Sequence, residues 1–232
     1  MMAGDVEVRI AADPQEAAAI AGFDLAKASQ QGGHIAVSGG STPRPAYAHA
    51  AELEPDWSAV VVWFADERCV PPDDSRSNYR LVRESLLDAL PQPPIVHRIH
   101  GELESEEAAV GYDEIAAGLQ LDLALLGIGP DGHTASLFPN APALDARDRA
   151  AVSADAGFEP FVPRVTLTIP VLCSAELVLF LVAGEDKADA VARAFGGAPD
   201  PGVPASLVRS ARGRTVAVLD RAAASRWEAA AS

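Results

Sequence analysis

Cysteine and basic residues are scarce in this chain of 232 residues. Only Cys69 and Cys173 are present, and their spacing suggests neither a zinc-binding motif nor a disulfide framework. Lys and Arg number 18 against 33 Asp and Glu, which gives a formal net charge of −15. Such an acidic chain repels phosphate backbones and anionic lipid, so neither nucleic acid nor a membrane surface is an expected partner.

Long hydrophobic runs are also missing. No run approaches the roughly 20 apolar residues of a membrane-spanning helix, and the N-terminal segment carries Asp5 and Glu7 where a signal peptide has an apolar core. Hydrophobic residues still make up 49% of the chain, enough for a substantial core. With no repeat and no long linker, we expect a single cytoplasmic domain over residues 1–232. A monomer is compatible with the sequence, which does not determine the oligomeric state.

Short runs rich in Val, Ile and Leu alternate with segments of helical character. The predicted strands cover residues 34–38, 59–64, 121–127, 164–169, 177–183 and 215–219. Most are nearly continuous apolar runs, as in strands that helices cover on both faces. The run 164–169 alternates instead, which favours an edge strand or an antiparallel strand. The pattern indicates an α/β fold with a mostly parallel central sheet and helices on both faces.

Three helices have recognisable starts. Asp13 and Pro14 begin a long Ala-rich helix, and Ser105 opens another with two glutamates in its first turn. Asn78 is expected to cap a third helix, with Tyr79, Val82, Leu86 and Leu90 on one face. The buried stripe of the helix that begins at Ser105 is predicted to comprise Ala108, Tyr112, Ile115 and Leu119. The Pro- and Asp-rich stretch 139–163 is predicted to be a loop.

Ligands of such sheets bind beyond the carboxyl ends of the strands, so the residues after each strand carry the functional prediction. The first strand is followed by Ser38-Gly39-Gly40-Ser41-Thr42-Pro43. Glycines allow a close approach of the backbone, and free amides at a helix N-terminus bind anions. The segment is therefore a candidate phosphate cradle, although an ordinary strand-to-helix turn has a similar composition.

Charged residues follow two further strands. Asp66-Glu67-Arg68 is either a solvated turn or a site in which Arg68 binds a carboxylate or a developing oxyanion. Lys187 lies in the first turn of a predicted helix, where the helix dipole disfavours a cation. It is expected either to meet an anionic ligand or to pair with Glu185 or Asp186. Arg164 is a further candidate for the same anion.

The loop after the strand 121–127 reads Gly127-Ile128-Gly129-Pro130-Asp131-Gly132-His133. Its letters match a dinucleotide-binding motif, but Pro130 removes a backbone donor and no long amphipathic helix follows. The loop instead holds Asp131 and His133 two residues apart. A histidine there is a plausible general base, with an ordinary pKa near 6.5, although isolated histidines are more often structural. The remaining histidines show no metal-ligand spacing, so we predict no metal and no organic cofactor.

Several of these segments, in order, resemble the 6-phosphogluconolactonase family. They are Ser38–Pro43, Trp63–Val70, Gly127–Pro139, Arg164–Pro170 and Gly184–Ala188. The resemblance extends from about Ser38 to Asp220 and implies a Rossmann-like α/β fold shared with amino-sugar-phosphate isomerases/deaminases. Those enzymes typically carry Asp-Glu-Tyr where this chain has Asp66-Glu67-Arg68, and Asn-Glu-Pro where it has Leu137-Phe138-Pro139. Both differences favour the lactonase.

The resemblance implies hydrolysis of 6-phospho-D-glucono-1,5-lactone to 6-phosphogluconate in the pentose phosphate pathway, with a sugar-phosphate lactone as the partner molecule. His133 is expected to activate water, with Asp131 orienting the imidazole or the loop. Arg68 is expected to contact the oxyanion or a hydroxyl, and Asp66 to hold either the sugar or Arg68. The phosphate is expected on Gly39, Gly40, Ser41 and Thr42, with Lys187 and Arg164. The alternatives are an amino-sugar-6-phosphate isomerase/deaminase and a non-catalytic sugar-phosphate sensor.

Overall fold

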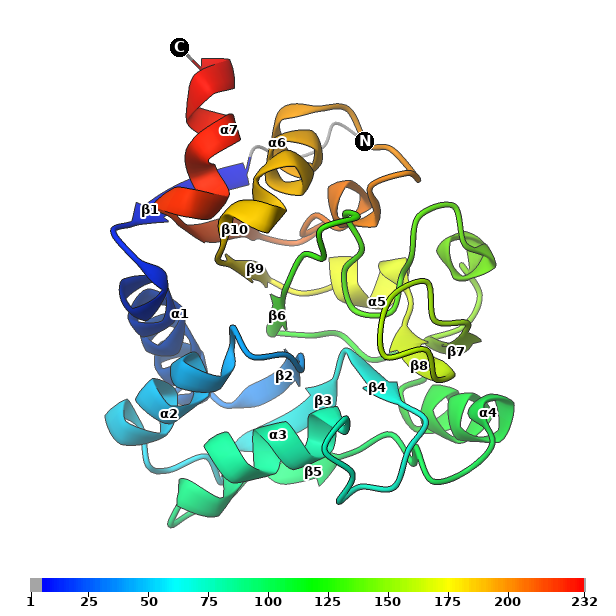
Figure 1. Ribbon diagram of the computed structural model, residues 1–232. Coiled ribbons are helices and arrows are strands. Elements are labelled where there is room, and N and C mark those ends of the chain that lie inside the picture. Colours follow the sequence, from blue (N-terminus) through cyan, green and yellow to red (C-terminus); the bar gives the residue numbers. More distant parts are fainter. Residues whose placement is uncertain (1–5, 232) are drawn as a thin grey trace.

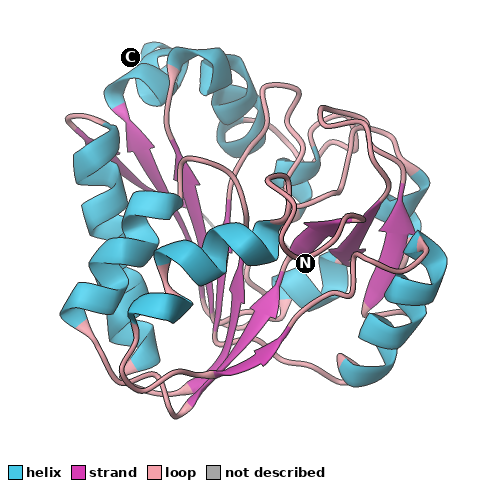
Figure 2. Cartoon of the chain, turned by 60° about the horizontal axis from the view of Figure 1, so that its bottom comes forward, coloured by secondary structure: helices cyan, strands magenta, loops and turns pink. Residues whose placement is uncertain are grey.

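The computed structural model describes residues 6–231, and side chains through residue 227. Its centre is a seven-stranded sheet in which every pairing is parallel, in the order β1-β10-β9-β6-β2-β3-β5 (Figures 1 and 2). These strands are β1 Val6–Ala11, β2 Gly33–Val37, β3 Val60–Phe64, β5 Ile95–His97, β6 Leu123–Leu126, β9 Leu177–Val182 and β10 Arg214–Asp220. The predicted parallel α/β fold is confirmed.

Helices cover both faces of this sheet. They are α1 Pro14–Ser29, α2 Arg44–Leu53, α3 Asn78–Ser85, α4 Ser105–Ile115, α5 Ile169–Cys173, α6 Ala188–Gly196 and α7 Arg221–Ala231. In Figure 1, α1, α2 and α3 pack side by side on one face, and α6 and α7 pack together on the other. The short 3₁₀ helices are η1 Leu87–Ala89, η2 Pro142–Asp145, η3 Glu185–Lys187 and η4 Pro204–Leu207.

A second, three-stranded antiparallel sheet lies beside the first, in the order β4-β8-β7. It consists of β4 Asp66–Arg68, β8 Arg164–Leu167 and β7 Ala151–Ala154. The run beginning at Arg164 is therefore antiparallel, as one alternative held, but it is the central strand and not an edge. The stretch 139–163 is not simply a loop, because it contains η2 and β7.

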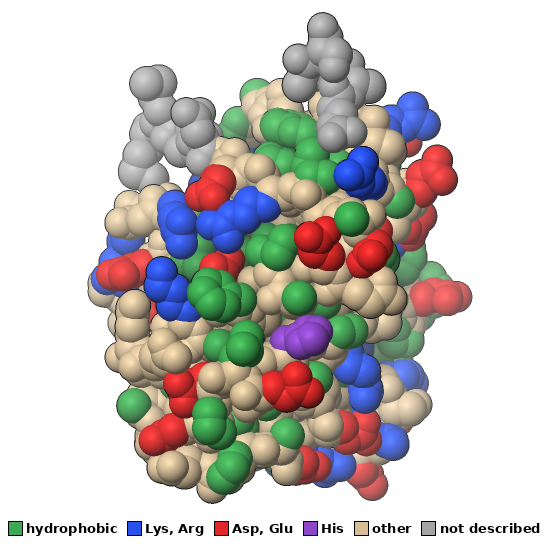
Figure 3. Space-filling view, turned by 90° about the vertical axis from the view of Figure 1, so that its left-hand side faces the viewer, with side chains coloured by type: hydrophobic (Ala, Val, Ile, Leu, Met, Phe, Trp, Pro, Cys, Tyr) green, Lys and Arg blue, Asp and Glu red, His purple; other side chains and the backbone are tan. Residues whose placement is uncertain are grey.

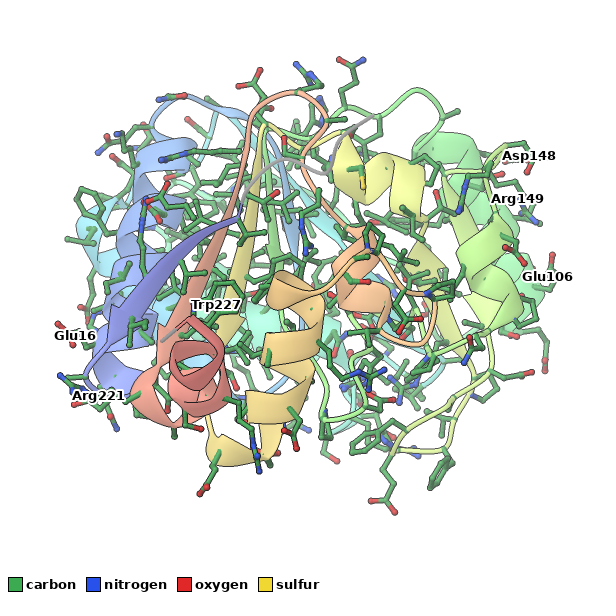
Figure 4. The ribbon with its side chains drawn as sticks, turned by 90° about the horizontal axis from the view of Figure 1, so that it is seen from above. Glu16, Glu106, Asp148, Arg149, Arg221 and Trp227 are labelled. Atoms are coloured by element: carbon green, nitrogen blue, oxygen red, sulfur yellow. The ribbon has the colours of Figure 1, made fainter. Side chains whose placement is uncertain are left out.

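Side chains of α4 hold this second sheet in place. Asp113 accepts hydrogen bonds from the backbone amides of Ala150 and Ala151, and Arg149 pairs with Asp113 at 3.1 Å and with Glu106 at 3.5 Å. Figure 4 shows Arg149 and Glu106 together at the outer edge of the molecule. Since α4 packs on β7 and β8, its acids attach the small sheet to the rest of the fold.

Two details of the predicted helices are wrong. The residue that caps α3 is Ser77, whose hydroxyl accepts from the amide of Arg80, and Asn78 is the first helical residue. Ile115 is 50% exposed and so does not belong to the buried stripe, whereas Ala108 and Tyr112 are buried and Leu119, beyond the end of α4, packs against the core. Strand β1 was not predicted from the sequence; it lies at the edge of the sheet, paired only with β10.

Candidate active site

The segment after β2 forms a turn whose start is held by side-chain hydrogen bonds. The Tyr47 hydroxyl, from α2, donates to the carbonyl of Ser38 at 2.6 Å and accepts from its amide at 3.0 Å. The Ser38 hydroxyl donates to the carbonyl of Leu125 on β6 at 2.8 Å. Gly40 has φ +99, a conformation that favours glycine. Among the described residues, no acceptor is found for the amides of residues 39–42, so the turn can bind an anion.

The loop after β6 brings Asp131 and His133 into contact. Asp131 Oδ1 lies 2.5 Å from His133 Nδ1 and also accepts the backbone amide of His133 at 3.1 Å. Burial alone would raise the pKa of Asp131, but the hydrogen bond and charge of His133 outweigh it and lower that pKa. Because a carboxylate accepts, Nδ1 is assigned the proton, and Nε2 is left as a free acceptor.

The same loop leaves space beside the imidazole only because residue 129 is glycine. A Cβ atom at Gly129 would lie 2.1 Å from ring atoms of His133 and 2.7 Å from Asp131 Oδ1. Phe138 and Phe158 flank the ring, with centroids 4.9 and 5.7 Å from that of His133. No helix follows the loop directly, as expected when the dinucleotide motif was rejected. The imidazole is thus held from several sides.

The charged side chains of strand β4 lie on two faces, since successive residues of a strand point in opposite directions. Glu67 is buried and accepts the amides of Asn78 and Tyr79 at 2.7 and 2.8 Å, which fixes the start of α3. Burial raises the pKa of Glu67, although these hydrogen bonds oppose the effect. Asp66 and Arg68 share the opposite face. The alternative of a solvated turn is wrong for this segment, because Asp66 and Glu67 are both buried.

Asp66 does not hold Arg68, which corrects one of the two predicted roles. Its carboxylate accepts from the Ser136 hydroxyl at 2.6 Å and from the Asn78 side-chain amide at 3.1 Å. Among the described ion pairs, none joins Asp66 to Arg68. The Arg68 guanidinium donates instead to the carbonyl of Arg76 at 2.7 Å.

Arg68 and Arg164 are direct partners across the antiparallel ladder of β4 and β8. Burial lowers the pKa of Arg164, while the nearby charge of Asp66 raises it and that of Arg68 lowers it further. Like charges opposite each other destabilise a sheet, so an anion bound near both guanidinium groups would relieve their repulsion. Arg164 also donates to the carbonyls of Phe158 and Pro160, at 3.1 and 2.8 Å, and so fixes the segment that carries Phe158.

Lys187 lies at the end of η3, directly before α6. Of the two expected arrangements, the pairing with Asp186 is observed, and the side chain also lines the same cavity as the cradle. Asp220 accepts the amide of Gly184, where the turn toward Lys187 begins with φ +103. The position of Lys187 is thus set from two strands, β9 and β10.

One cavity of about 330 Å³ unites these elements. Every predicted site residue lines it except Asp131, which stands behind His133. The predicted lining residues are Gly39, Gly40, Ser41, Thr42, Asp66, Arg68, His133, Arg164 and Lys187. The cavity size suits a small ligand. The sequence prediction missed Asn78, Phe138 and Phe158 as lining residues; the only signal for Asn78 was its place at the start of a helix.

Several other features bear on function. Within residues 6–231, no helix is both long and apolar enough to span a membrane. No three His, Cys, Asp or Glu side chains of the described residues cluster as metal ligands would. The face that carries β1, α1 and α2 mixes acidic, basic and hydrophobic side chains and shows no continuous basic patch (Figure 3).

Comparison with known proteins confirms the resemblance seen in the sequence. The family model described as glucosamine-6-phosphate isomerases/6-phosphogluconolactonase matches residues 12–217. The chain is 38% identical over 203 residues to the 6-phosphogluconolactonase of Synechocystis sp., covering 82% of this chain and 83% of that protein. For human 6-phosphogluconolactonase the identity is 41% over 169 residues, with 69% and 66% covered. The crystal structure of 6-phosphogluconolactonase from Thermotoga maritima has a TM-score of 0.82 and 30% identity, covering 93% of this chain and 100% of that one. The chain therefore belongs to the glucosamine-6-phosphate isomerase/6-phosphogluconolactonase family.

Proposed function

We propose that this protein hydrolyses 6-phospho-D-glucono-1,5-lactone to 6-phospho-D-gluconate, the lactonase step of the pentose phosphate pathway. One observation carries the proposal. A histidine backed by a carboxylate opens onto the same cavity as a turn of unpaired amides, two arginines and a lysine. The curated relatives named above are lactonases of this kind. The predicted cytoplasmic location stays a prediction.

The chemistry needs a base, an oxyanion partner and a proton for the leaving oxygen. His133 Nε2 takes a proton from water as the water oxygen attacks the lactone carbonyl carbon. The carbonyl oxygen becomes an oxyanion, to which the Arg68 guanidinium donates. The ring C–O bond then breaks as the carbonyl re-forms, and His133 returns the proton to the departing ring oxygen. The net change adds one water across the ester.

The phosphate provides binding energy and takes no part in bond breaking. Its oxygens accept from the amides of residues 39–42 and from the hydroxyls of Ser41 and Thr42, and Lys187 supplies a positive charge beside them. Arg164 contributes its charge and keeps Phe158 over the imidazole. Binding the phosphate at one end of the cavity positions the lactone carbonyl for attack at the other.

The isomerase alternative is disfavoured by the residue beside His133, which is Phe138. Phe138 occupies the position where the isomerases/deaminases carry their ring-opening glutamate, and its ring stands 4.9 Å from that of His133. An aromatic ring supplies no proton to a sugar ring oxygen. The sensor alternative predicts binding of a sugar phosphate without any effect on the lifetime of the lactone.

The test is to follow the disappearance of freshly generated 6-phosphogluconolactone at neutral pH with and without the protein. We expect strong acceleration by the wild type and a turnover number lower by about 10²–10⁴-fold in His133→Ala, with 6-phosphogluconate affinity retained. Binding without acceleration would support a sensor. Release of ammonia from glucosamine-6-phosphate, with no lactone hydrolysis, would support the deaminase.

A further inference from the structure

Among the described residues, two buried side-chain polar atoms have no hydrogen-bond partner. Within the part of the chain whose side chains are described, residues 6–227, they are Arg68 Nε and Asn78 Oδ1. Buried polar atoms are nearly always paired, so each exception calls for an explanation. Both residues line the cavity described above, where a ligand could supply the missing partners.

The orientation of the Asn78 side chain is fixed by Asp66. Asn78 Nδ2 donates to the Asp66 carbonyl at 2.9 Å and to its carboxylate at 3.1 Å. Rotating the amide by half a turn would place Oδ1 against two acceptors, so this orientation is the only one with favourable contacts. The backbone of Asn78 is held as well, because its amide donates to the Glu67 carboxylate at 2.7 Å. The residue is 1% exposed.

Asn78 Oδ1 points to the border of the cradle. A Cβ atom at Gly39 would lie 1.8 Å from Oδ1, so only glycine at position 39 leaves room for this oxygen. A carbonyl oxygen cannot donate, and it repels a phosphate oxygen. The ligand group that suits Oδ1 beside the cradle is therefore a donor, and a sugar ring offers hydroxyl groups there.

We propose that Asn78 determines substrate specificity by accepting a hydrogen bond from one ring hydroxyl of the bound sugar-phosphate lactone. Arg68 Nε, on the adjacent strand β4, is the matching donor on this side of the cavity. A hydroxyl group both donates and accepts, which suits this pair of unpaired atoms. The inference rests on the proposed function and adds to it the basis for recognising the sugar ring.

The two residues differ in how firmly the protein holds their side chains. Among the described hydrogen bonds, the Arg68 guanidinium makes one to protein, from Nη1 to the Arg76 carbonyl. Asn78 itself stays fixed by Asp66 and Glu67. The acceptor is therefore pre-positioned, whereas the Arg68 guanidinium is held by fewer contacts.

The experiment compares kcat/KM for the parent lactone and for three phosphorylated lactones that each lack the hydroxyl at carbon 2, 3 or 4. The quantity compared is, for each deoxy-lactone, the ratio of kcat/KM for the parent lactone to kcat/KM for that deoxy-lactone. In the wild type, one of the three ratios should be about ten, because that deoxy-lactone lacks the hydroxyl that donates to Asn78 Oδ1. In Asn78→Ala, that ratio should fall toward one, because only the hydrogen bond from Arg68 Nε to this hydroxyl remains, while the other two ratios stay as in the wild type. A purely structural role for Asn78 would leave all three ratios unchanged.

Gly39→Ala provides a second variant, because its new methyl group displaces Asn78 Oδ1 without altering Asn78. All four substrates carry the phosphate, so damage to the cradle affects them equally, and the same single ratio should fall. Ser136→Ala is the matched control, since it removes the other side-chain contact to Asp66 and leaves Oδ1 in place. Its three ratios should equal those of the wild type.

The outcomes separate this inference from the proposed function. If the wild type does not hydrolyse the parent lactone, the proposed function fails. If it does, but no ratio differs between the wild type and the two variants, the role of Asn78 is overturned. The wild-type ratios alone also overturn it if none of the three deoxy-lactones reacts more slowly, even when Asn78→Ala does not fold.

Discussion

Asp131 Oδ1 and His133 Nδ1 lie 2.5 Å apart, and this contact decides which imidazole nitrogen faces the cavity as an acceptor. In Asp131→Asn, the new amide group can donate to Nδ1 and favour the tautomer that carries its proton on Nε2. In that tautomer, Nε2 already carries a proton, so it cannot accept another from water. We expect kcat to fall by about 100-fold or more. Asp148→Asn, at an exposed acid on the outer edge in Figure 4, should leave kcat unchanged.

The same carboxylate predicts how stability depends on pH. The pKa of Asp131 is lower in the folded protein than the ordinary value of about 3.9 for an unfolded chain. Its contribution is therefore present above about pH 4 and is lost as the pH falls through the lower folded value. Urea unfolding of the wild type and Asp131→Asn should give free energies that converge below pH 4. A difference that widens there would contradict the assignment.

Gly129 is predicted to be essential for turnover and dispensable for folding. In Gly129→Ala, the new methyl group would lie 2.1 Å from the His133 ring, so the imidazole must move away from Asp131 or from the substrate. Because catalysis is sensitive to small displacements, kcat should fall at least tenfold. Gly111→Ala is the control, since nothing lies within 4 Å of its new Cβ atom. A fully active Gly129→Ala would show that the loop accommodates the methyl group.

Removing the lysine should affect binding more than chemistry. In Lys187→Ala, KM for the phosphorylated lactone should rise by about 10-fold or more while kcat changes little, because the lost contact is to the phosphate. Glucono-1,5-lactone without phosphate should react equally with both proteins. Lys27→Ala, in α1, is a control of the same type outside the cavity. A selective loss of kcat would place Lys187 at the reacting carbonyl instead.

The paired arginines predict stabilisation by anions. Since Arg68 and Arg164 face each other across the ladder, a divalent anion such as inorganic phosphate should bind near them and raise the melting temperature. The rise should exceed that from sodium chloride at equal ionic strength, and it should shrink in Arg68→Gln. Equal effects of phosphate and chloride in the wild type would mean that the salt acts only by screening.

Much of the site could be predicted from the sequence because the residues that follow parallel strands meet at one edge of a sheet. The turn at Gly39, the loop at His133 and the turn at Lys187 all obey this rule, and each follows a continuous apolar run that is easy to recognise. A local pattern sufficed there, since only the position of each strand end was needed.

The pairing of Arg68 with Arg164 could not be predicted in the same way. Strand β4 is three charged residues long and has no apolar alternation, and its partner lies almost a hundred residues further along the chain. The role of Asn78 depends on side-chain contacts with Asp66 that spacing does not reveal. For Asp66, the sequence left two roles open, and the ion pair with Arg68 was wrong because Ser136 and Asn78 occupy its carboxylate.

Ala65 joins the two sheets within a single residue. It lies between β3 and β4, fully buried; its amide donates to Val37 of β2 at 2.8 Å, and its carbonyl accepts from Leu167 of β8 at 2.8 Å. The cradle that follows β2 and the arginines of β4 and β8 are therefore attached to one short stretch of backbone. Because this backbone fixes the distance between them, we expect a lactone with one carbon more or fewer between carbonyl and phosphate to be a poorer substrate.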